Sequence, residues 1–188
     1  MAPLSKRDRL WTFWFATHLA VILLVDAVPL YPSHLYIPSS SPLHFLHRLR
    51  QFYLSTFNDP IMSWTPDAGH DYWIHLFFNV EIIFYVPTCM YAVYQHAVKA
   101  DRQDGFRGYE EMWYMMYAFV VAFTTLVCLH DVLYWDPEVY SAADKRMFVF
   151  GLYGPYCVIP AIFFTDMYTR LLRRFRVSEG VEVAKKTQ

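Results

Sequence analysis

One apolar stretch, from Tyr72 to Tyr94, constrains this chain more than any other part of it. With 23 residues, it is long enough to cross the hydrocarbon core of a bilayer as a helix. It carries a single carboxylate, Glu81, which lies nine residues beyond Tyr72. A charge at such a depth is costly unless it is paired, protonated or facing a cavity. The stretch therefore predicts a membrane span, and Glu81 is a candidate functional residue.

Three further apolar blocks, separated by polar and proline-containing connections, bring the predicted number of spans to four. The chain is 56% hydrophobic and only 18% charged, which favours a membrane protein over a soluble domain. Its net charge of −1 argues against a nucleic-acid partner. We therefore expect an all-α fold, a four-transmembrane-helix bundle within residues 10–175, preceded by a short segment 1–9 and followed by a tail 176–188. The spans are expected at about 10–28, 72–94, 112–133 and 147–171.

The connection at 29–71 contains a further predicted helix, from Leu43 to Phe57. Apolar residues recur there at helical spacing, and charged residues face elsewhere. Such an amphipathic helix either lies on the membrane surface or caps the bundle. The stretch Phe57-Asn58-Asp59-Pro60 is expected to end it. The apolar set comprises Leu46, Leu49, Phe52 and Tyr53.

Lysine and arginine residues set the expected orientation in the membrane. Twelve of them fall in the terminal segments and the second polar connection, and four fall on the other side. Because cytosolic segments carry the excess of positive charge, both termini should be cytosolic. Lys185 and Lys186 then stand at the positions of a dilysine endoplasmic-reticulum retrieval signal, which a cytosolic C-terminal tail can carry.

Asp26 is the expected partner of Glu81. It stands near the non-cytosolic end of the first span, and the second span enters from that side with Glu81 at a depth of ~13 Å. Two carboxyls in an apolar site repel when both are ionised, so one of them should keep its proton. Such a pair suits a cationic amine, a sterol hydroxyl or a proton shuttle. The structural alternatives are that Asp26 caps the span at the interface and that Glu81 makes a structural hydrogen bond. Pro87 predicts a kink one to two turns beyond Glu81.

The remaining polar groups in the spans give weaker signals. His18 precedes Asp26 by eight residues, so it either orients Asp26, contacts a ligand or packs against a neighbouring helix. No histidine pair has a third ligand at a known spacing, so neither a metal nor a cofactor is expected. Cys89, Cys128 and Cys157 fall within apolar blocks and are expected to be buried thiols. No hydrolase, zinc-protease or nucleotide-binding motif occurs, so no catalytic residue is assigned.

The order and spacing of five short motifs make the chain resemble the sigma-2 receptor (transmembrane protein 97) family. That family belongs to the EXPERA group, which also contains the emopamil-binding sterol isomerases. The resemblance covers residues 10–175. The motifs are His18 followed by Asp26; Phe52-Tyr53 leading to Phe57-Asn58-Asp59-Pro60-Ile61; Glu81 followed by Pro87; Thr124-Thr125-Leu126; and Tyr153-Gly154-Pro155-Tyr156 followed by Ile159-Pro160.

The resemblance implies a four-helix bundle, usually dimeric, in the endoplasmic-reticulum membrane. Its pocket opens toward the bilayer and binds sterols and cationic amphiphiles. By the same resemblance, Asp26 is the salt-bridge partner of an amine, Glu81 is its protonated neighbour and Asp59 supports the site. Tyr153 and Tyr156 match pocket-lining positions, and Thr124 joins the ligand-binding set. The chain departs from the family at Ala20, which replaces a proline, and at Tyr85, which replaces a glutamine.

Three functions follow as hypotheses. The first is a non-enzymatic protein that binds sterols or cationic amphiphiles and acts in intracellular sterol (cholesterol) homeostasis or trafficking, as a homodimer and with sterol-transport membrane proteins as partners. The second is a sterol double-bond isomerase, in which Glu81, Asp26 and His18 would supply an acid and a base. The isomerases of the group, however, have an additional span. The third is a chaperone-like membrane partner that binds through residues 43–57 and the tail.

Overall fold

The computed structural model describes residues 5–66, 72–99 and 105–186, with side chains up to residue 180. The chain is 83% helical, and no strand occurs within these described ranges. It divides into two compact units, one before and one after residue 104, and each is described by itself. Four helices of the described ranges are long and apolar enough to cross a membrane, which confirms the all-α fold with four spans. They are Lys6–Asp26, Tyr72–Val98, Gly108–Tyr134 and Ala142–Gly180.

The first span begins with α1 (Lys6–Val21) and continues as a π-helical segment, η1 (Ile22–Asp26). Ser5 caps α1, because its hydroxyl oxygen accepts a hydrogen bond of 3.1 Å from the backbone N–H of Asp8. The span packs against the second half of the next span, α5 (Val86–Val93). Asp26 is thus the last residue of the first span.

The second span is one continuous run of four helical segments. It begins with α4 (Tyr72–Val80) and passes through a π-helical segment, η5 (Glu81–Tyr85), into α5. A second π-helical segment, η6 (Tyr94–Val98), ends it. The segment η5 begins at Glu81 and ends two residues before Pro87, the proline from which the sequence predicts a kink.

Three of the π-helical segments end two or three residues before a proline. They are η1 before Pro29, η5 before Pro87, and η7 (Phe148–Leu152) before Pro155. In each, a backbone N–H donates to the carbonyl five residues earlier, as Val86 does to Glu81. Because proline has no N–H to donate, the regular ladder is interrupted there in any case. Before Pro87 and Pro155 the wider turn lets an α-helix resume, whereas the first span ends at Asp26.

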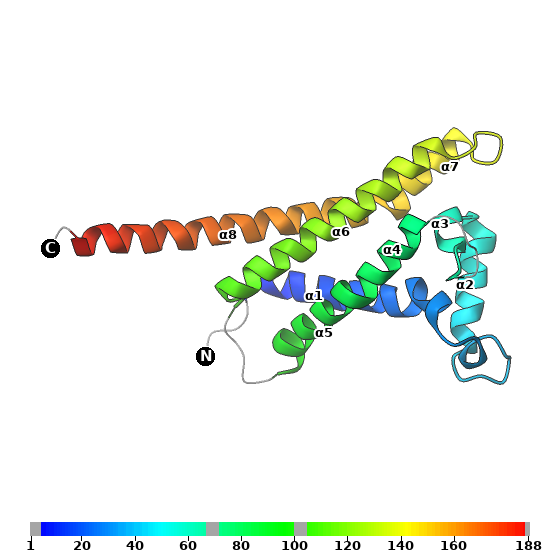
Figure 1. The fold of residues 1–188 in the computed structure, drawn as a ribbon, viewed down its shortest axis with the longest axis horizontal. Coiled ribbons are helices and arrows are strands. Elements are labelled where there is room, and N and C mark those ends of the chain that lie inside the picture. Colours follow the sequence, from blue (N-terminus) through cyan, green and yellow to red (C-terminus); the bar gives the residue numbers. More distant parts are fainter. Residues whose placement is uncertain (1–4, 67–71, 100–104, 187–188) are drawn as a thin grey trace. The chain divides into compact units, whose positions relative to one another are not determined.

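The connection between the first two spans contains α2 (His44–Phe57) and α3 (Pro60–Ser63). Asn58 ends α2 in the left-handed conformation, with φ 51°, and its N–H donates to the Leu54 carbonyl over 2.8 Å. The predicted loop helix and its end are therefore confirmed. Helix α2 packs against η1 and the short turn η2 (Val28–Leu30), and it lies across the end of the first span (Figure 1).

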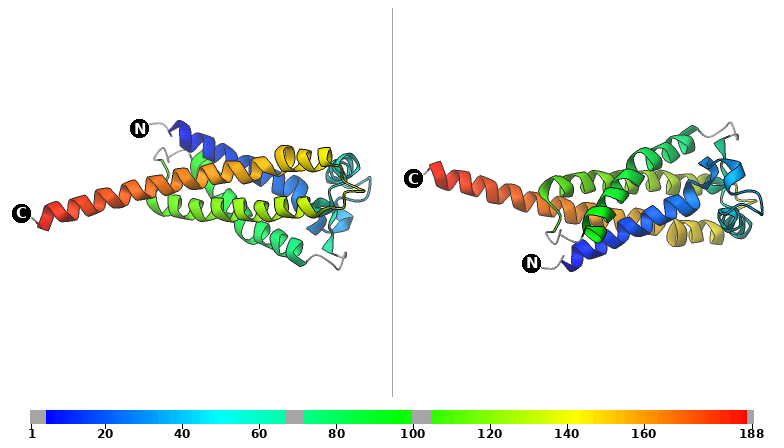
Figure 2. Two further views of the ribbon diagram at one scale, coloured as in Figure 1. Left: turned by 90° about the horizontal axis from the view of Figure 1, so that it is seen from above. Right: turned by 90° about the horizontal axis from the view of Figure 1, so that it is seen from below.

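The second unit consists of α6 (Gly108–Tyr134), α7 (Ala142–Met147), η7 and α8 (Gly154–Lys186). Helices α6 and α8 lie side by side in every view, and α8 continues past the start of α6 (Figures 1 and 2). Gly154 stands where η7 meets α8, and a Cβ there would collide with the Val149 carbonyl. The fully buried core between α6 and α8 comprises Tyr114, Tyr117, Phe163 and Met167.

An ion pair ties α8 to the start of α6. The guanidinium of Arg174 donates to both carboxylate oxygens of Glu111, over 2.6 and 3.0 Å. It also donates to the Phe106 carbonyl over 3.1 Å. Glu111 is buried, with 2% of its surface exposed. A buried carboxylate needs this partner, because it lacks the solvation that water would give.

Replacing Arg174 by Ala should lower the free energy of unfolding by about 2 kcal/mol, since it leaves Glu111 buried without its cation. The half-exposed arginine keeps this loss below that of a fully buried pair. Thermal unfolding in lipid nanodiscs measures it. Arg173→Ala is the matched control, because Arg173 is the preceding residue and is exposed. It should stay within about 0.5 kcal/mol of the unaltered protein. Equal losses in both variants would contradict a specific role for Arg174.

Candidate functional site

Asp26 and Glu81 both stand at a π-helical segment of the first unit. Asp26 is the last residue of η1, and Glu81 is the first residue of η5. The two carboxyls lie close enough to interact electrostatically, and Asp26 also interacts electrostatically with Asp59. The structure therefore brings together the two acids that the sequence paired. Short π-helical segments often occur at functional sites, where they displace side chains from regular helical register.

Glu81 carries a buried polar atom whose hydrogen-bonding capacity is not satisfied. Its Oε2 atom is buried and has no hydrogen-bond partner among the residues that the structure describes. Buried polar atoms of native proteins almost always have a partner, so such an atom needs an explanation. The structural alternative for Glu81 was a hydrogen bond within the protein, and Oε2 makes no such bond to the described residues. The free oxygen suits a ligand that donates a proton or carries a positive charge.

Asp59 supports this cluster from the connection. It is fully buried and caps α3, since its Oδ1 accepts from the backbone N–H groups of Ile61 and Met62 over 2.9 and 3.1 Å. Its Oδ2 accepts a hydrogen bond of 2.7 Å from the Tyr53 hydroxyl of α2. Both carboxylate oxygens are therefore used within the protein. This geometry makes Asp59 a positioning residue that fixes the connection beside Asp26.

Tyr53 links the loop helix to the acids. Burial raises the pKa of its hydroxyl well above the usual range, and the charge of Asp59, the hydrogen bond to Asp59 and the charge of Asp26 raise it further. The raised pKa favours the neutral hydroxyl, which donates the hydrogen bond to Asp59. Tyr53 thus anchors α2 at the acidic end of the first span.

Arg50 anchors the same helix one turn earlier. Its Nη2 donates to the carbonyls of Met62 and Trp64, over 2.7 and 3.1 Å. Burial lowers the pKa of Arg50 from its ordinary value. The indole of Trp64 in turn stacks on the rings of His75 and Phe78, with centroids 5.6 and 5.1 Å apart. These contacts fasten α2 and its connection to the start of the second span.

His18 lies in an aromatic layer on α1. It is buried, and its ring centroid is 5.5 Å from that of Trp14 and 5.7 Å from that of Tyr85. Tyr85 belongs to η5, the segment that begins at Glu81. The structure therefore places His18 between its own helix and the second span, in agreement with the packing alternative. A direct role toward a ligand stays a prediction.

The other predicted site residues belong to the second unit. The Thr124 hydroxyl donates to carbonyls of its own helix, those of Val120 and Val121, over 3.0 and 3.1 Å. Tyr153 stacks on Phe148 with centroids 6.2 Å apart, and Tyr156 is half-buried at the start of α8. Their assignment to a ligand site stays a prediction. So does the retrieval signal at Lys185 and Lys186, whose side chains lie outside the described part.

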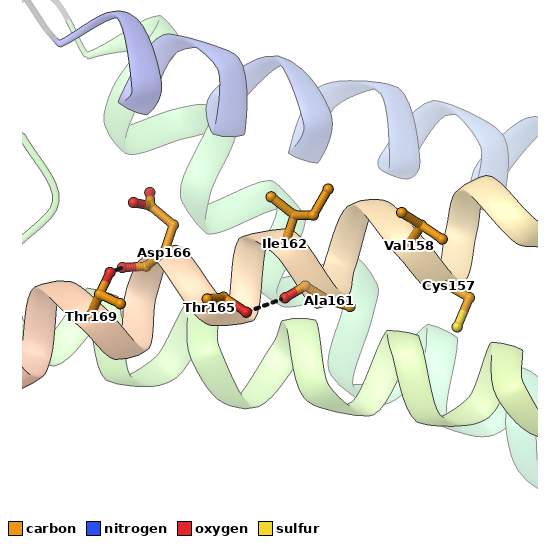
Figure 3. A pocket seen from close by; sticks show the side chains of 7 residues that line it. All are labelled: Cys157, Val158, Ala161, Ile162, Thr165, Asp166 and Thr169. Atoms are coloured by element: carbon orange, nitrogen blue, oxygen red, sulfur yellow. Dashed lines mark hydrogen bonds between the residues drawn. The ribbon is translucent and has the colours of Figure 1, made fainter.

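The second unit also has an open groove of about 570 Å³ along one face of α8 (Figure 3). Its surface is mainly apolar. The Thr165 and Thr169 hydroxyls donate to carbonyls of α8 itself, and the Asp166 carboxylate forms an ion pair of 2.8 Å with Arg170. The polar groups of the groove are therefore engaged within the helix. The lining residues are Cys157, Val158, Ala161, Ile162, Thr165, Asp166 and Thr169.

Sequence reasoning missed the contributions of Tyr53 and Arg50. It placed Tyr53 on the apolar face of the loop helix and Arg50 on the polar side. In the structure both face the connection, together with the buried Leu46, while Leu49 and Phe52 are exposed. The spacing of Leu46, Arg50 and Tyr53, which are four and three residues apart, is the signal that identifies this packed face.

Comparisons with known proteins agree with this arrangement. Residues 45–167 match the family described as EXPERA (EXPanded EBP superfamily), a range that includes Asp59 and Glu81. The chain is also similar to "Efficient mitochondria targeting-associated protein 19" of Schizosaccharomyces pombe. The two are 30% identical over 166 residues, which cover 88% of this chain and 77% of the relative. The match confirms, at the level of this superfamily, the resemblance drawn from the sequence. With four helices able to span a membrane, the chain is a multi-pass membrane protein that belongs to the EXPERA superfamily.

Proposed function

We propose that the protein binds sterols or cationic amphiphiles at the acidic cluster of Asp26 and Glu81. A ligand ammonium or hydroxyl group would meet the two carboxyls, and its apolar body would lie among the membrane spans. The buried rings of Trp14, His18 and Tyr85 form an aromatic layer between the same two spans, and Tyr85 belongs to the π-helical segment that begins at Glu81. Aromatic rings favour both cations and apolar rings as neighbours. The protein would act in intracellular sterol homeostasis or trafficking.

The observation that carries the proposal is the unsatisfied Oε2 atom of Glu81 beside a second carboxyl. An acid at this depth of a membrane span serves a ligand, an ion or a proton far more often than it serves packing. Asp59 uses both of its oxygens within the protein, so a ligand has Asp26 and Glu81 left to contact. A cation between them would offset their mutual repulsion.

The proposed location is the endoplasmic-reticulum membrane, with both termini in the cytosol. Two sequence features support it, the twelve-to-four distribution of lysine and arginine and the dilysine pair Lys185-Lys186. The acidic end of the first span would then face the lumenal leaflet. We further propose a homodimer, as the family resemblance implies.

Competition binding in nanodiscs tests the proposal. A radiolabelled sterol and an unlabelled cationic amphiphile should displace each other completely, because both would occupy the site of Asp26 and Glu81. The control protein carries Asp26→Asn together with Glu81→Gln and should bind neither ligand at the concentrations that saturate the unaltered protein. Binding of both ligands to the doubly substituted protein would place the site elsewhere.

A sterol isomerase is the second candidate, favoured by the presence of two interacting carboxyls and by membership of the EBP superfamily. Moving a ring double bond requires an acid that protonates one carbon and a base that removes a proton from another. Incubation of the purified protein with a Δ8-sterol, followed by mass spectrometry, separates the candidates. We expect no turnover. Turnover that is abolished by Glu81→Gln would replace the binding-only function with an isomerase.

A chaperone-like role is the third candidate. Its support is the name of the fission-yeast relative, which associates that protein with efficient targeting to mitochondria. In this chain the exposed parts of α2 and the C-terminal extension of α8 would bind a partner protein. Neutralising the exposed charges of residues 43–57 should then abolish a pull-down of that partner. An unchanged pull-down would reject this candidate.

A further inference from the structure

The loop helix α2 exposes apolar side chains on a fixed face. Phe45, Leu49 and Phe52 follow one another at intervals of four and three residues, so they share one side of the helix. They expose 53%, 41% and 66% of their surfaces. Three large apolar side chains in line form a contiguous patch rather than scattered exposure. We define these three residues as the apolar face of α2.

The apolar face cannot turn inward, because the neighbouring side of α2 is anchored three times. Leu46 is buried, Arg50 donates to the Met62 and Trp64 carbonyls, and Tyr53 donates to Asp59. These anchors are offset from the apolar face by one residue, which is about 100° around a helix. The contacts that hold the acidic cluster therefore also hold the apolar face outward.

The position of α2 relates this face to the bilayer. The helix joins two membrane spans and packs against η1, the last turns of the first span. It lies across the end of that span (Figure 1), as a helix in the membrane plane does. Leu23 and Leu24 of η1 expose 37% and 42% of their surfaces, which acyl chains would contact in a bilayer. Lipid therefore reaches the level at which α2 packs.

The charge on the same side of α2 fits a lipid interface. Arg48 is exposed and stands three residues after Phe45 and four before Phe52. An arginine among apolar residues extends its guanidinium toward phosphate groups while its stem stays in the apolar layer. In water the exposed apolar side chains would remain unburied. At the headgroup boundary of a bilayer, acyl chains bury them and phosphate groups bind the Arg48 guanidinium.

We infer that α2 is an interfacial helix, with Phe45, Leu49 and Phe52 inserted into the bilayer and Arg48 at the level of the phosphates. This interaction does not depend on the proposed ligand. An interfacial α2 also fixes the depth of the acidic site, because Tyr53 and Asp59 are then held at the level of the headgroups. An amphiphile that lies in the leaflet with its polar head at that depth would meet Asp26 without crossing water.

Footprinting of the full chain tests the inference, with one copy per nanodisc of phosphatidylcholine. One sample is labelled by a lipid-partitioning diazirine and another by hydroxyl radicals. Each rate, mapped by mass spectrometry, is divided by the rate of the same residue in the denatured chain. Phe13 of α1, 70% exposed, serves as the lipid standard, and Val139 of the connection between α6 and α7, 56% exposed, serves as the water standard.

Phe45 and Phe52 should take up the diazirine as Phe13 does and should be oxidised about tenfold less than Val139. Phe52→Ser should reduce diazirine labelling of Phe45, whereas the matched control Gln51→Ser, an exposed residue of the same turn, should leave it unchanged. Oxidation of Phe45 and Phe52 at the Val139 rate would overturn the inference. Protection that appears only in nanodiscs with two copies would also overturn it, because a second copy would then cover the face.

Discussion

Replacing Asp26 by Asn should weaken the binding of a cationic amphiphile about 100-fold. The substitution keeps the shape of the side chain but removes the negative charge that meets the ligand cation. Removing one partner of a desolvated ion pair costs about 2–5 kcal/mol, and each 1.4 kcal/mol corresponds to a tenfold change in affinity. Saturation binding of a radiolabelled amphiphile to the protein in nanodiscs measures the effect.

Asp8→Asn is the matched control for this prediction. Asp8 is a buried aspartate of α1 in the same span, eighteen residues before Asp26. At ~1.5 Å per residue the two carboxyls are separated by ~27 Å along the helix. The control should therefore keep the affinity of the unaltered protein. Unchanged affinity in the Asp26→Asn protein would remove Asp26 from the site, and equal losses in both variants would indicate a general disturbance of α1.

Replacing Asp59 by Ala should lower the free energy of unfolding by about 3 kcal/mol. The variant loses the cap of α3 and the acceptor of the Tyr53 hydroxyl, and it leaves that hydroxyl half-buried without a partner. A helix cap contributes about 1 kcal/mol, and a hydrogen bond to a charged group contributes about 1.5–3 kcal/mol. The midpoint of thermal unfolding should consequently fall by about 6–12 °C. Scanning fluorimetry in nanodiscs measures it.

Tyr53→Phe separates the two parts of this loss. It removes the hydroxyl but leaves Asp59 as the cap of α3, so it should cost only about 1 kcal/mol. Amphiphile binding should weaken in the Asp59→Ala protein, because α2 and α3 lose their fixed position beside Asp26. A variant as stable as the unaltered protein would contradict the role of Asp59 as a positioning residue. Equal losses in both variants would show that the cap contributes nothing.

Sequence reasoning predicted the four spans and the loop helix, because both depend on local patterns. Runs of apolar residues identify spans, and the stretch from Phe57 to Pro60 carries the residues that end a helix. Glu81 was also identifiable from the sequence, since a lone acid in a span stands out against its apolar neighbours. Its pairing with Asp26 followed from the expected direction of the two spans.

The π-helical segments and the packed face of α2 were not predictable in the same way. Pro87 indicates that the helix cannot continue unchanged, but the hydrogen-bond pattern that replaces it depends on packing. Arg50 looks like a solvent-facing residue in sequence, because its partners are backbone carbonyls, which no pattern reveals. The exposed apolar face of α2 likewise follows from these tertiary contacts. Apolar spacing alone grouped Leu49 and Phe52 with Leu46 and Tyr53, which the structure packs inward.

The site residues taken from the family resemblance lie in both units, and their ligand-binding roles stay predictions. Asp26 interacts electrostatically with Glu81 and with Asp59 within the first unit. Thr124, Tyr153 and Tyr156 belong to the other unit, where Thr124 donates to carbonyls of its own helix and Tyr153 stacks on Phe148. Tyr85, which stands where the family has a glutamine, contributes a ring against His18 instead of an amide.

Chemical modification by a hydrophobic carbodiimide tests the central claim most directly. Such a reagent enters the bilayer and adds to protonated carboxyls, so it reports whether an intramembrane acid is protonated and open to a ligand. Peptide mapping should find the adduct on Glu81, whose Oε2 atom has no partner among the described residues. A saturating cationic amphiphile should prevent the modification. An unmodified Glu81, or a modification that the amphiphile leaves unchanged, would contradict the acidic ligand site.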